Sequence, residues 1–202
     1  MDDTRRLDRA DRFSLYLSAA LAAVVIAATG WATLDRLSEV AAADGIPVLV
    51  PLSGETAELP LGPDGALVSV DVDTATVVVN DPAPATAFAL WAEPIFGFVA
   101  VVVGMVIAAT FFMRIARGRA FDRGTIRLVI AGAITVATAW LVGSILTNMT
   151  TNGALSAISD YTYDSVIFTT DLMPGVWILV LGAVAGALQL GEKLRRDTEG
   201  LV

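Results

Sequence analysis

The sequence predicts an all-α membrane bundle of four transmembrane helices, with both termini in the cytoplasm and a small extracytoplasmic β-rich insertion between the first two helices. Three observations support this fold class. The chain has 202 residues, is 55% hydrophobic and has a mean hydropathy of +0.70, which is unusually apolar for a soluble domain. Four long stretches contain no charged residue. The basic residues gather at the ends of these stretches.

The four charge-free stretches are the predicted transmembrane helices. Each has about 20 residues, which at roughly 1.5 Å per residue matches a hydrocarbon core of about 30 Å. Lipid offers no partner for unpaired backbone groups, so these stretches are expected to be helical. They cover residues 13–34, 94–113, 128–147 and 172–191. Ala41, Ala42 and Ala43 resemble a signal-peptide cleavage site, but the first stretch exceeds the roughly 7–15 residues of a signal core, which favours an uncleaved anchor.

The distribution of charge predicts the orientation in the membrane. Twelve of the thirteen basic residues lie in the N-terminal segment 1–12, the turn 114–127 and the tail 192–202. The positive-inside rule places these segments, and both termini, in the cytoplasm of a bacterium, with the helices in its plasma membrane. Segments 35–93 and 148–171 hold thirteen acidic residues and one arginine, and are predicted to be extracytoplasmic. Arginine outnumbers lysine twelve to one, which indicates a GC-rich, actinobacterial genome.

The insertion at 35–93 is predicted to form two to four short strands. Residues 45–51 form a β-like run between glycine and proline, valines alternate with polar residues over 68–73, and 76–79 is β-rich again. The DTAT sequence between the last two runs is expected to form a hairpin, and Pro63-Asp64-Gly65 a turn. The acidic residues lack the spacing of an EF-hand, so a solvated acidic face is favoured over a metal site.

The composition disfavours enzymatic chemistry. The chain has no cysteine and no histidine, which excludes disulfides, thiol nucleophiles, histidine bases and the usual zinc sites. No P-loop or nucleophile elbow is present, and the central parts of the four helices carry no charge. The sequence therefore predicts a protein without catalytic residues or cofactors, and the uncharged helix centres disfavour ion-coupled transport.

Five arginines mark the turn 114–127. They are interpreted as a topology signal that contacts lipid headgroups, or as part of a docking surface with the tail. Direct nucleic-acid binding is disfavoured because Phe121 is the only aromatic residue of the turn. Gly118 is expected to end the preceding helix in a left-handed conformation, and Asp122 to cap the next one. The candidate docking or lipid-contact residues are Arg114, Arg117, Arg119, Phe121, Arg123, Arg127, Glu192, Arg195, Arg196 and Asp197.

Small residues at four-residue spacing are candidates for helix packing. They are Ala139 and Gly143 in the third helix, and Gly182 and Gly186 in the fourth. Such pairs let helix backbones approach closely. They are expected to pack the bundle internally or to form the face of a homo-oligomer.

The middle and the end of the chain resemble a known family. The sequence RGRAFDRGTIRLVIAGAITVATAWLVG is similar to the signature of the domain of unknown function 2975 family, and so is the ending GEKLRRDTEGLV. The family comprises bacterial membrane proteins with four predicted helices, and the resemblance is clearest over the last three helices. The matching positions are Arg117, Gly118, Phe121, Arg127 and Gly132, then Leu194, Asp197, Thr198, Glu199, Gly200, Leu201 and Val202.

The resemblance suggests a function. Family members are often encoded beside a small helix-turn-helix regulator, which implies a non-enzymatic sensory or regulatory membrane partner of a cytoplasmic DNA-binding protein. The alternative is a permease, a channel or a structural subunit of a larger membrane complex. A polar cavity lined by Thr135, Thr138 and Asn148 would favour transport, whereas a dry, alanine-packed bundle would favour regulation.

Overall fold

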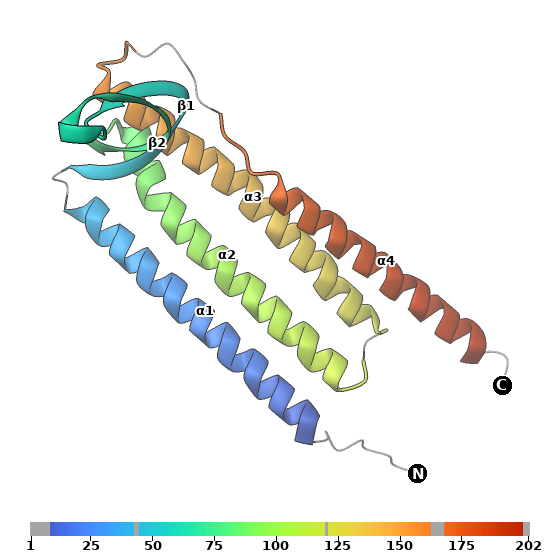
Figure 1. The fold of residues 1–202 in the computed structure, drawn as a ribbon. Helices are drawn as coiled ribbons and strands as arrows, with labels where there is room; N and C mark the ends of the chain where they lie inside the picture. Colours follow the sequence, from blue (N-terminus) through green and yellow to red (C-terminus); the bar gives the residue numbers. More distant parts are fainter. Residues whose placement is uncertain (1–8, 43–44, 120, 163–167, 200–202) are drawn as a thin grey trace. The chain divides into compact units, whose positions relative to one another are not determined.

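The computed structural model of the chain describes residues 9–42, 45–119, 121–162 and 168–199. Its four helices are α1 (Arg9–Ala41), α2 (Pro84–Ala116), α3 (Arg123–Ile158) and α4 (Met173–Glu199), all visible in Figure 1. Between α1 and α2 lie strand β1 (Ile46–Leu59), the 3-10 helix η1 (Pro63–Gly65) and strand β2 (Val68–Val79). Some residues named above lie outside the described part: 1–8, Ala43, 200–202 and the side chains of Arg195, Thr198 and Glu199.

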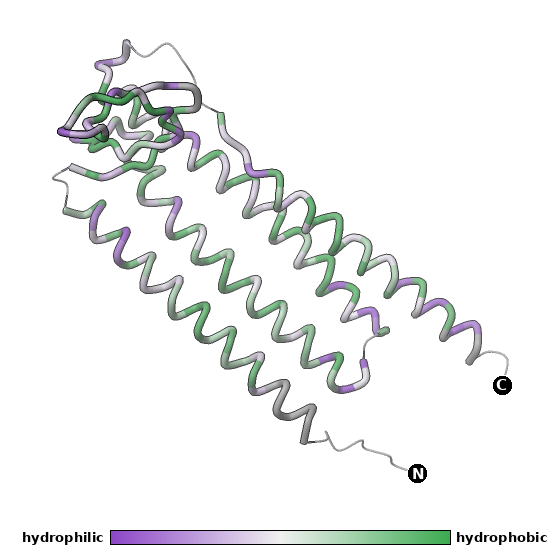
Figure 2. The backbone as a smooth tube through the Cα atoms, in the orientation of Figure 1, coloured by the Kyte–Doolittle hydropathy of each residue, from purple (hydrophilic) through white to green (hydrophobic). Residues whose placement is uncertain are grey.

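The four helices are those of a multi-pass membrane protein. Each is long and apolar enough to cross a membrane, with candidate spans of 27, 33, 36 and 22 residues. Figure 2 shows hydrophobic residues along the middle of the helices and hydrophilic residues at the turn between α2 and α3 and near the end of α4. The four predicted crossings are thereby confirmed as apolar helices.

The helices extend beyond the charge-free stretches. α2 begins at Pro84 rather than at residue 94, and α3 continues to Ile158 rather than ending at 147. Segments 84–93 and 148–158, which were predicted to belong to loops, are therefore helical. A charged or polar residue marks where a helix stops being fully apolar, but it does not end the helix. Proline is also favoured at the first position of a helix, where its missing N–H costs no hydrogen bond.

The chain divides into two compact units. The helical unit comprises residues 1–34, 95–143 and 171–202, and the insertion unit comprises residues 35–94 and 144–170. In the helical unit, consecutive helices are neighbours. A Cβ atom on Gly30 of α1 would lie 3.3 Å from the ring of Phe98 of α2, and one on Gly132 of α3 would lie 3.7 Å from Ile107 of α2. Similarly, a Cβ atom on Gly175 of α4 would lie 3.8 Å from the indole of Trp140 of α3.

The insertion unit contains an antiparallel sheet of two strands. The register runs from Ile46 opposite Val79 to Leu59 opposite Val68, with an irregularity between Pro51 and Glu55. The predicted hairpin at DTAT is wrong, because these residues lie inside the continuous strand β2. The chain reverses instead through η1, where Asp64 and Gly65 adopt positive φ values of 57° and 78°. The turn predicted at this proline-containing sequence is confirmed.

One face of the sheet contributes to an apolar core within the insertion unit. Ile46, Val48 and Val50 alternate along β1 and are buried together with Val79 of β2. Helix residues complete the cluster, namely Val40 of α1, Leu90 of α2, and Ala154 and Leu155 of α3. The period of two along β1 thus directs every second side chain onto the ends of three helices. The sheet has two strands, the smallest number in the predicted range of two to four.

Candidate functional site: the arginine-rich turn and the end of α4

The turn between α2 and α3 begins with a defined helix ending. Gly118 has a φ of +71°, the left-handed conformation that glycine adopts without strain. Its N–H donates to the carbonyl of Ile115 at 2.8 Å, and the N–H of Arg119 donates to the carbonyl of Arg114 at 2.9 Å. These two bonds form a Schellman motif, so the prediction for Gly118 is confirmed. The motif gives the first arginines of the turn a fixed backbone.

An ion pair closes the turn. The guanidinium of Arg114, near the end of α2, donates to the carboxylate of Asp122 at 3.0 Å, and both side chains are partly exposed. The guanidinium lies directly over Gly124, where a Cβ atom would be 2.7 Å from its Cζ. The carbonyl of Asp122 accepts from the N–H groups of Thr125 and Ile126, so Asp122 stands at the predicted cap position. Its side chain bonds across the turn to α2.

A buried threonine fixes the centre of the turn. The side chain of Thr125 is fully buried, and its hydroxyl donates to the carbonyl of Arg119 at 2.7 Å. This bond satisfies a polar group that would otherwise cost about 1–3 kcal/mol when buried without a partner. It also ties the first turn of α3 to the residue that follows Gly118.

The aromatic residue of the turn packs on α4. A Cβ atom on Gly191 would lie 2.5 Å from Cε1 and 2.6 Å from Cδ1 of Phe121. The ring therefore lies against the bare backbone of α4 at this glycine, while 43% of the Phe121 residue surface stays exposed. A side chain at position 191 would displace the ring, so the contact depends on glycine.

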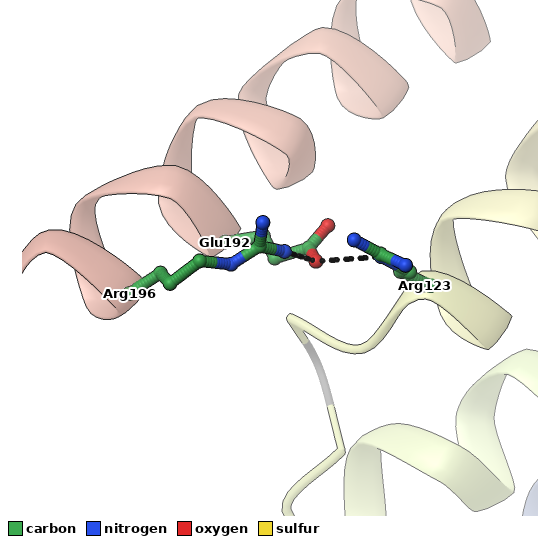
Figure 3. A network of polar contacts seen from close by, with 3 residues as sticks. All are labelled: Arg123, Glu192 and Arg196. Carbon is green, nitrogen blue, oxygen red and sulfur yellow. Dashed lines mark hydrogen bonds and ion pairs between the residues drawn. The ribbon is translucent and has the colours of Figure 1, made fainter. Parts of the chain in front are cut away.

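A carboxylate bridges α3 and α4 beside this contact. Oε1 of Glu192 accepts from Nε of Arg123 at 3.3 Å and from Nη2 of Arg196 at 2.5 Å, as Figure 3 shows. The side chain of Glu192 is only 18% exposed, whereas those of Arg123 and Arg196 are 70% and 61% exposed. The carboxylate is thus held between the helices, and both guanidinium groups remain accessible.

The resulting surface is strongly basic. We define the basic surface as the exposed residues Arg117, Arg119, Arg123, Arg127, Lys193 and Arg196. Among the residues that the structure describes, the guanidinium groups of Arg117, Arg119 and Arg127 form no ion pair. Their charges are available to an anionic partner. Asp197 is also exposed, which places one carboxylate near the basic residues of α4.

The structure connects five of the ten predicted docking residues through specific side-chain contacts, namely Arg114, Phe121, Arg123, Glu192 and Arg196. Thr125 and Gly191 were not singled out from the sequence, although they make these contacts possible. The sequence does offer one indication of Gly191, because this glycine directly precedes the first charged residue after the fourth apolar stretch. The glycines predicted to pack helices lack such close neighbours. At Gly143, Gly182 and Gly186 a Cβ atom would meet no described atom of another element within 4 Å. Whether these positions form a homo-oligomer face stays a prediction.

Comparisons with protein-family models, with curated proteins and with solved structures found no match. The resemblance of the turn and tail to the domain of unknown function 2975 family therefore stays a prediction.

Proposed function

We propose that the protein is a non-enzymatic regulatory membrane protein that docks a cytoplasmic protein on the basic surface. The observation that carries this proposal is that four exposed arginines lie on a turn fixed by contacts within itself and with α4. A surface whose conformation is already fixed loses less entropy on binding, so more of its interaction energy contributes to affinity. The positive-inside rule supports the placement of this surface in the cytoplasm.

The chemistry of the surface favours a protein partner with exposed carboxylates. Arginine binds carboxylates through paired hydrogen bonds with defined geometry. The family resemblance suggests that the partner is a small helix-turn-helix regulator, held at the membrane until a signal releases it. Such a partner would present an acidic surface away from its DNA-binding helix.

Two polar groups within α3 support regulation over transport. The hydroxyl of Thr135 donates to the carbonyl of Ala131 at 2.9 Å within the same helix. The side-chain amide of Asn148 bonds to both the N–H and the carbonyl of Thr169, at 3.1 and 3.2 Å. Both side chains are thus hydrogen-bonded to backbone groups, which leaves fewer free polar groups for a solute.

The proposal is tested by crosslinking in native membranes, affinity purification of the full chain and identification of the captured proteins. The triple variant Arg117→Gln, Arg119→Gln, Arg127→Gln removes three charges without breaking a contact described above. The matched control, Glu55→Gln, Glu58→Gln, Asp73→Asn, removes three charges from the strands. Capture of a helix-turn-helix protein by the wild type and the control, but not by the triple variant, is expected.

A second experiment separates docking from lipid contact. The captured regulator is added to the purified chain in nanodiscs of phosphatidylcholine, which carry no net charge. Binding in these discs, lost in the triple variant, supports a direct protein contact. Recovery of membrane subunits alone, or equal capture by the triple variant, would contradict the docking proposal and leave the arginines as a topology signal.

A further inference from the structure

The insertion unit contains an open cavity of about 590 Å³ that the proposed function does not use. This volume lies within the range of roughly 300–1,000 Å³ typical of small-molecule sites. Much of the wall is apolar, formed by Val48 and Leu49 of β1 together with Leu90 and Pro94 of α2. A few polar groups converge on the same space, as in most ligand pockets.

The most distinctive polar group in the lining is the carboxylate of Glu93. Thr147 of α3 donates from its hydroxyl to Oε1 of Glu93 at 2.7 Å. The hydroxyl of Thr150, one turn further along α3, lies 3.1 Å from Oε2 and 3.0 Å from the carbonyl of Leu146. All three polar side chains line the cavity. The two threonines orient the carboxylate, and each of its oxygens retains a lone pair for a further donor.

The charge balance of the cavity favours a cationic ligand. Arg36 and Glu39 also line it, and they form an ion pair of 2.7 Å with each other. Because these two charges offset one another, Glu93 leaves the described lining with a net charge of about −1. A ligand that carries one positive charge would neutralise it.

The sequence positions of these groups favour a ligand that also has an apolar part. Arg36 lies just after the charge-free stretch that ends at residue 34, and Glu93 lies just before the stretch that begins at 94. Arg36 and Glu93 therefore mark the ends of two apolar segments, where a polar headgroup and an apolar chain meet in a bilayer.

We propose that this cavity binds a primary ammonium group carried on an apolar body, with the ammonium at the carboxylate of Glu93 and the apolar part along Val48, Leu49 and Leu90. A primary ammonium supplies three N–H donors, which suits a carboxylate whose two oxygens each keep an acceptor position. The ammonium can belong to an ethanolamine lipid headgroup or to a free alkylamine. This site is independent of the docking surface.

The test uses the full chain in phosphatidylcholine nanodiscs and native mass spectrometry to count bound amphiphiles. The probes are dodecylammonium and dodecyltrimethylammonium, which share charge and chain length but differ in their ability to donate hydrogen bonds. The variant Glu93→Gln removes the charge while keeping the shape, and Glu58→Gln is the matched control because Glu58 is exposed on β1 outside the cavity lining. Thr147→Val keeps the charge and removes one orienting bond.

The expected results follow from the hydrogen bonds to the carboxylate. Dodecylammonium should bind at one saturable site in the wild type and in Glu58→Gln. Its affinity should fall about tenfold to a hundredfold in Glu93→Gln, and about twofold to tenfold in Thr147→Val. The Thr147→Val result carries the test if Glu93→Gln does not fold. The quaternary probe should bind at least about tenfold more weakly than the primary one.

Replacing half of the phosphatidylcholine by phosphatidylethanolamine identifies the source of the ammonium. Competition with dodecylammonium, and retention of the ethanolamine lipid by the wild type but not by Glu93→Gln, indicates a lipid ligand. Binding of dodecylammonium without such competition indicates a free amine. Equal binding of the two alkyl cations, or equal binding by Glu93→Gln and Glu58→Gln, would overturn the proposal.

Discussion

Replacing Gly153 by alanine is expected to disrupt the packing of α3 on α2 within the insertion unit. A Cβ atom on Gly153 would lie 2.6 Å from Cγ2 and 2.8 Å from Cβ of Thr86. Thr86 is 5% exposed, and its Cβ is attached directly to the α2 backbone, so it cannot turn away. The added methyl group must therefore separate the two helices.

Two opposing contributions determine how much Gly153→Ala changes the free energy of unfolding. Overpacking of a filled contact costs about 1–3 kcal/mol. Alanine is favoured over glycine in a helix interior by about 1 kcal/mol, which offsets part of this cost. Gly104→Ala in α2 is the matched control, because no described atom lies within 4 Å of its added methyl group. Both variants gain the same helix preference of alanine over glycine. Gly153→Ala should therefore be the less stable of the two by about 1–3 kcal/mol, the cost of overpacking.

The assay is reversible unfolding of the purified chain in detergent, followed by circular dichroism, together with hydrogen exchange of the insertion unit. The double variant Gly153→Ala, Thr86→Ala removes the hydroxyl and Cγ2 of the threonine and should recover part of the lost stability. Equal free energies of unfolding for Gly153→Ala and Gly104→Ala would refute the close packing of Gly153 on Thr86.

Three further changes test other contacts. In a double-mutant cycle, Glu192→Gln and Arg123→Gln should show a coupling of about 0.2–1 kcal/mol, because the Arg123 side chain is largely exposed to solvent. A coupling of zero would contradict the bridge. Asn148→Ala should destabilise the chain by about 1–3 kcal/mol and speed amide exchange at Thr169, because the N–H and carbonyl of Thr169 lose their partner. Unchanged exchange would argue against these bonds. Gly45→Ala should lower the stability measured by thermal unfolding by about 1–3 kcal/mol. Gly45 has a φ of +76°, and an added Cβ atom would lie 2.7 Å from Val78 of β2. A variant as stable as the wild type would exclude that conformation.

The membrane helices could be predicted because lipid imposes a strong constraint on composition. A stretch without charge and of spanning length has few other structures available. The helix ends are harder to predict, since Glu93 is compatible both with a loop and with a helix that leaves the apolar layer. In the structure Glu93 lies inside α2, which begins at Pro84.

The strands show the complementary limit. DTAT resembles a turn when it is considered alone, yet Thr74 lies opposite Pro51 and Thr76 lies opposite Leu49 in the sheet. The pairing with a distant segment outweighs the local preference, as is common for strands. Likewise, the candidate site was predictable as a set of arginines, but not the partners that hold it. Phe121 contacts Gly191, which lies 70 residues further along the chain. The spacing of residues in the sequence does not reveal such a contact.

The two prolines of β1 have a consequence for self-association through the sheet. A sheet of two strands has two outer edges, and each edge can recruit a strand from another molecule and so start aggregation. Pro47 and Pro51 lack backbone N–H groups, and proline is tolerated in a strand where its nitrogen points away from the partner. The outer edge of β1 thereby lacks two donors. Along β2, the carboxylates of Asp71 and Asp73 repel a second copy of the same strand, so both edges resist self-association.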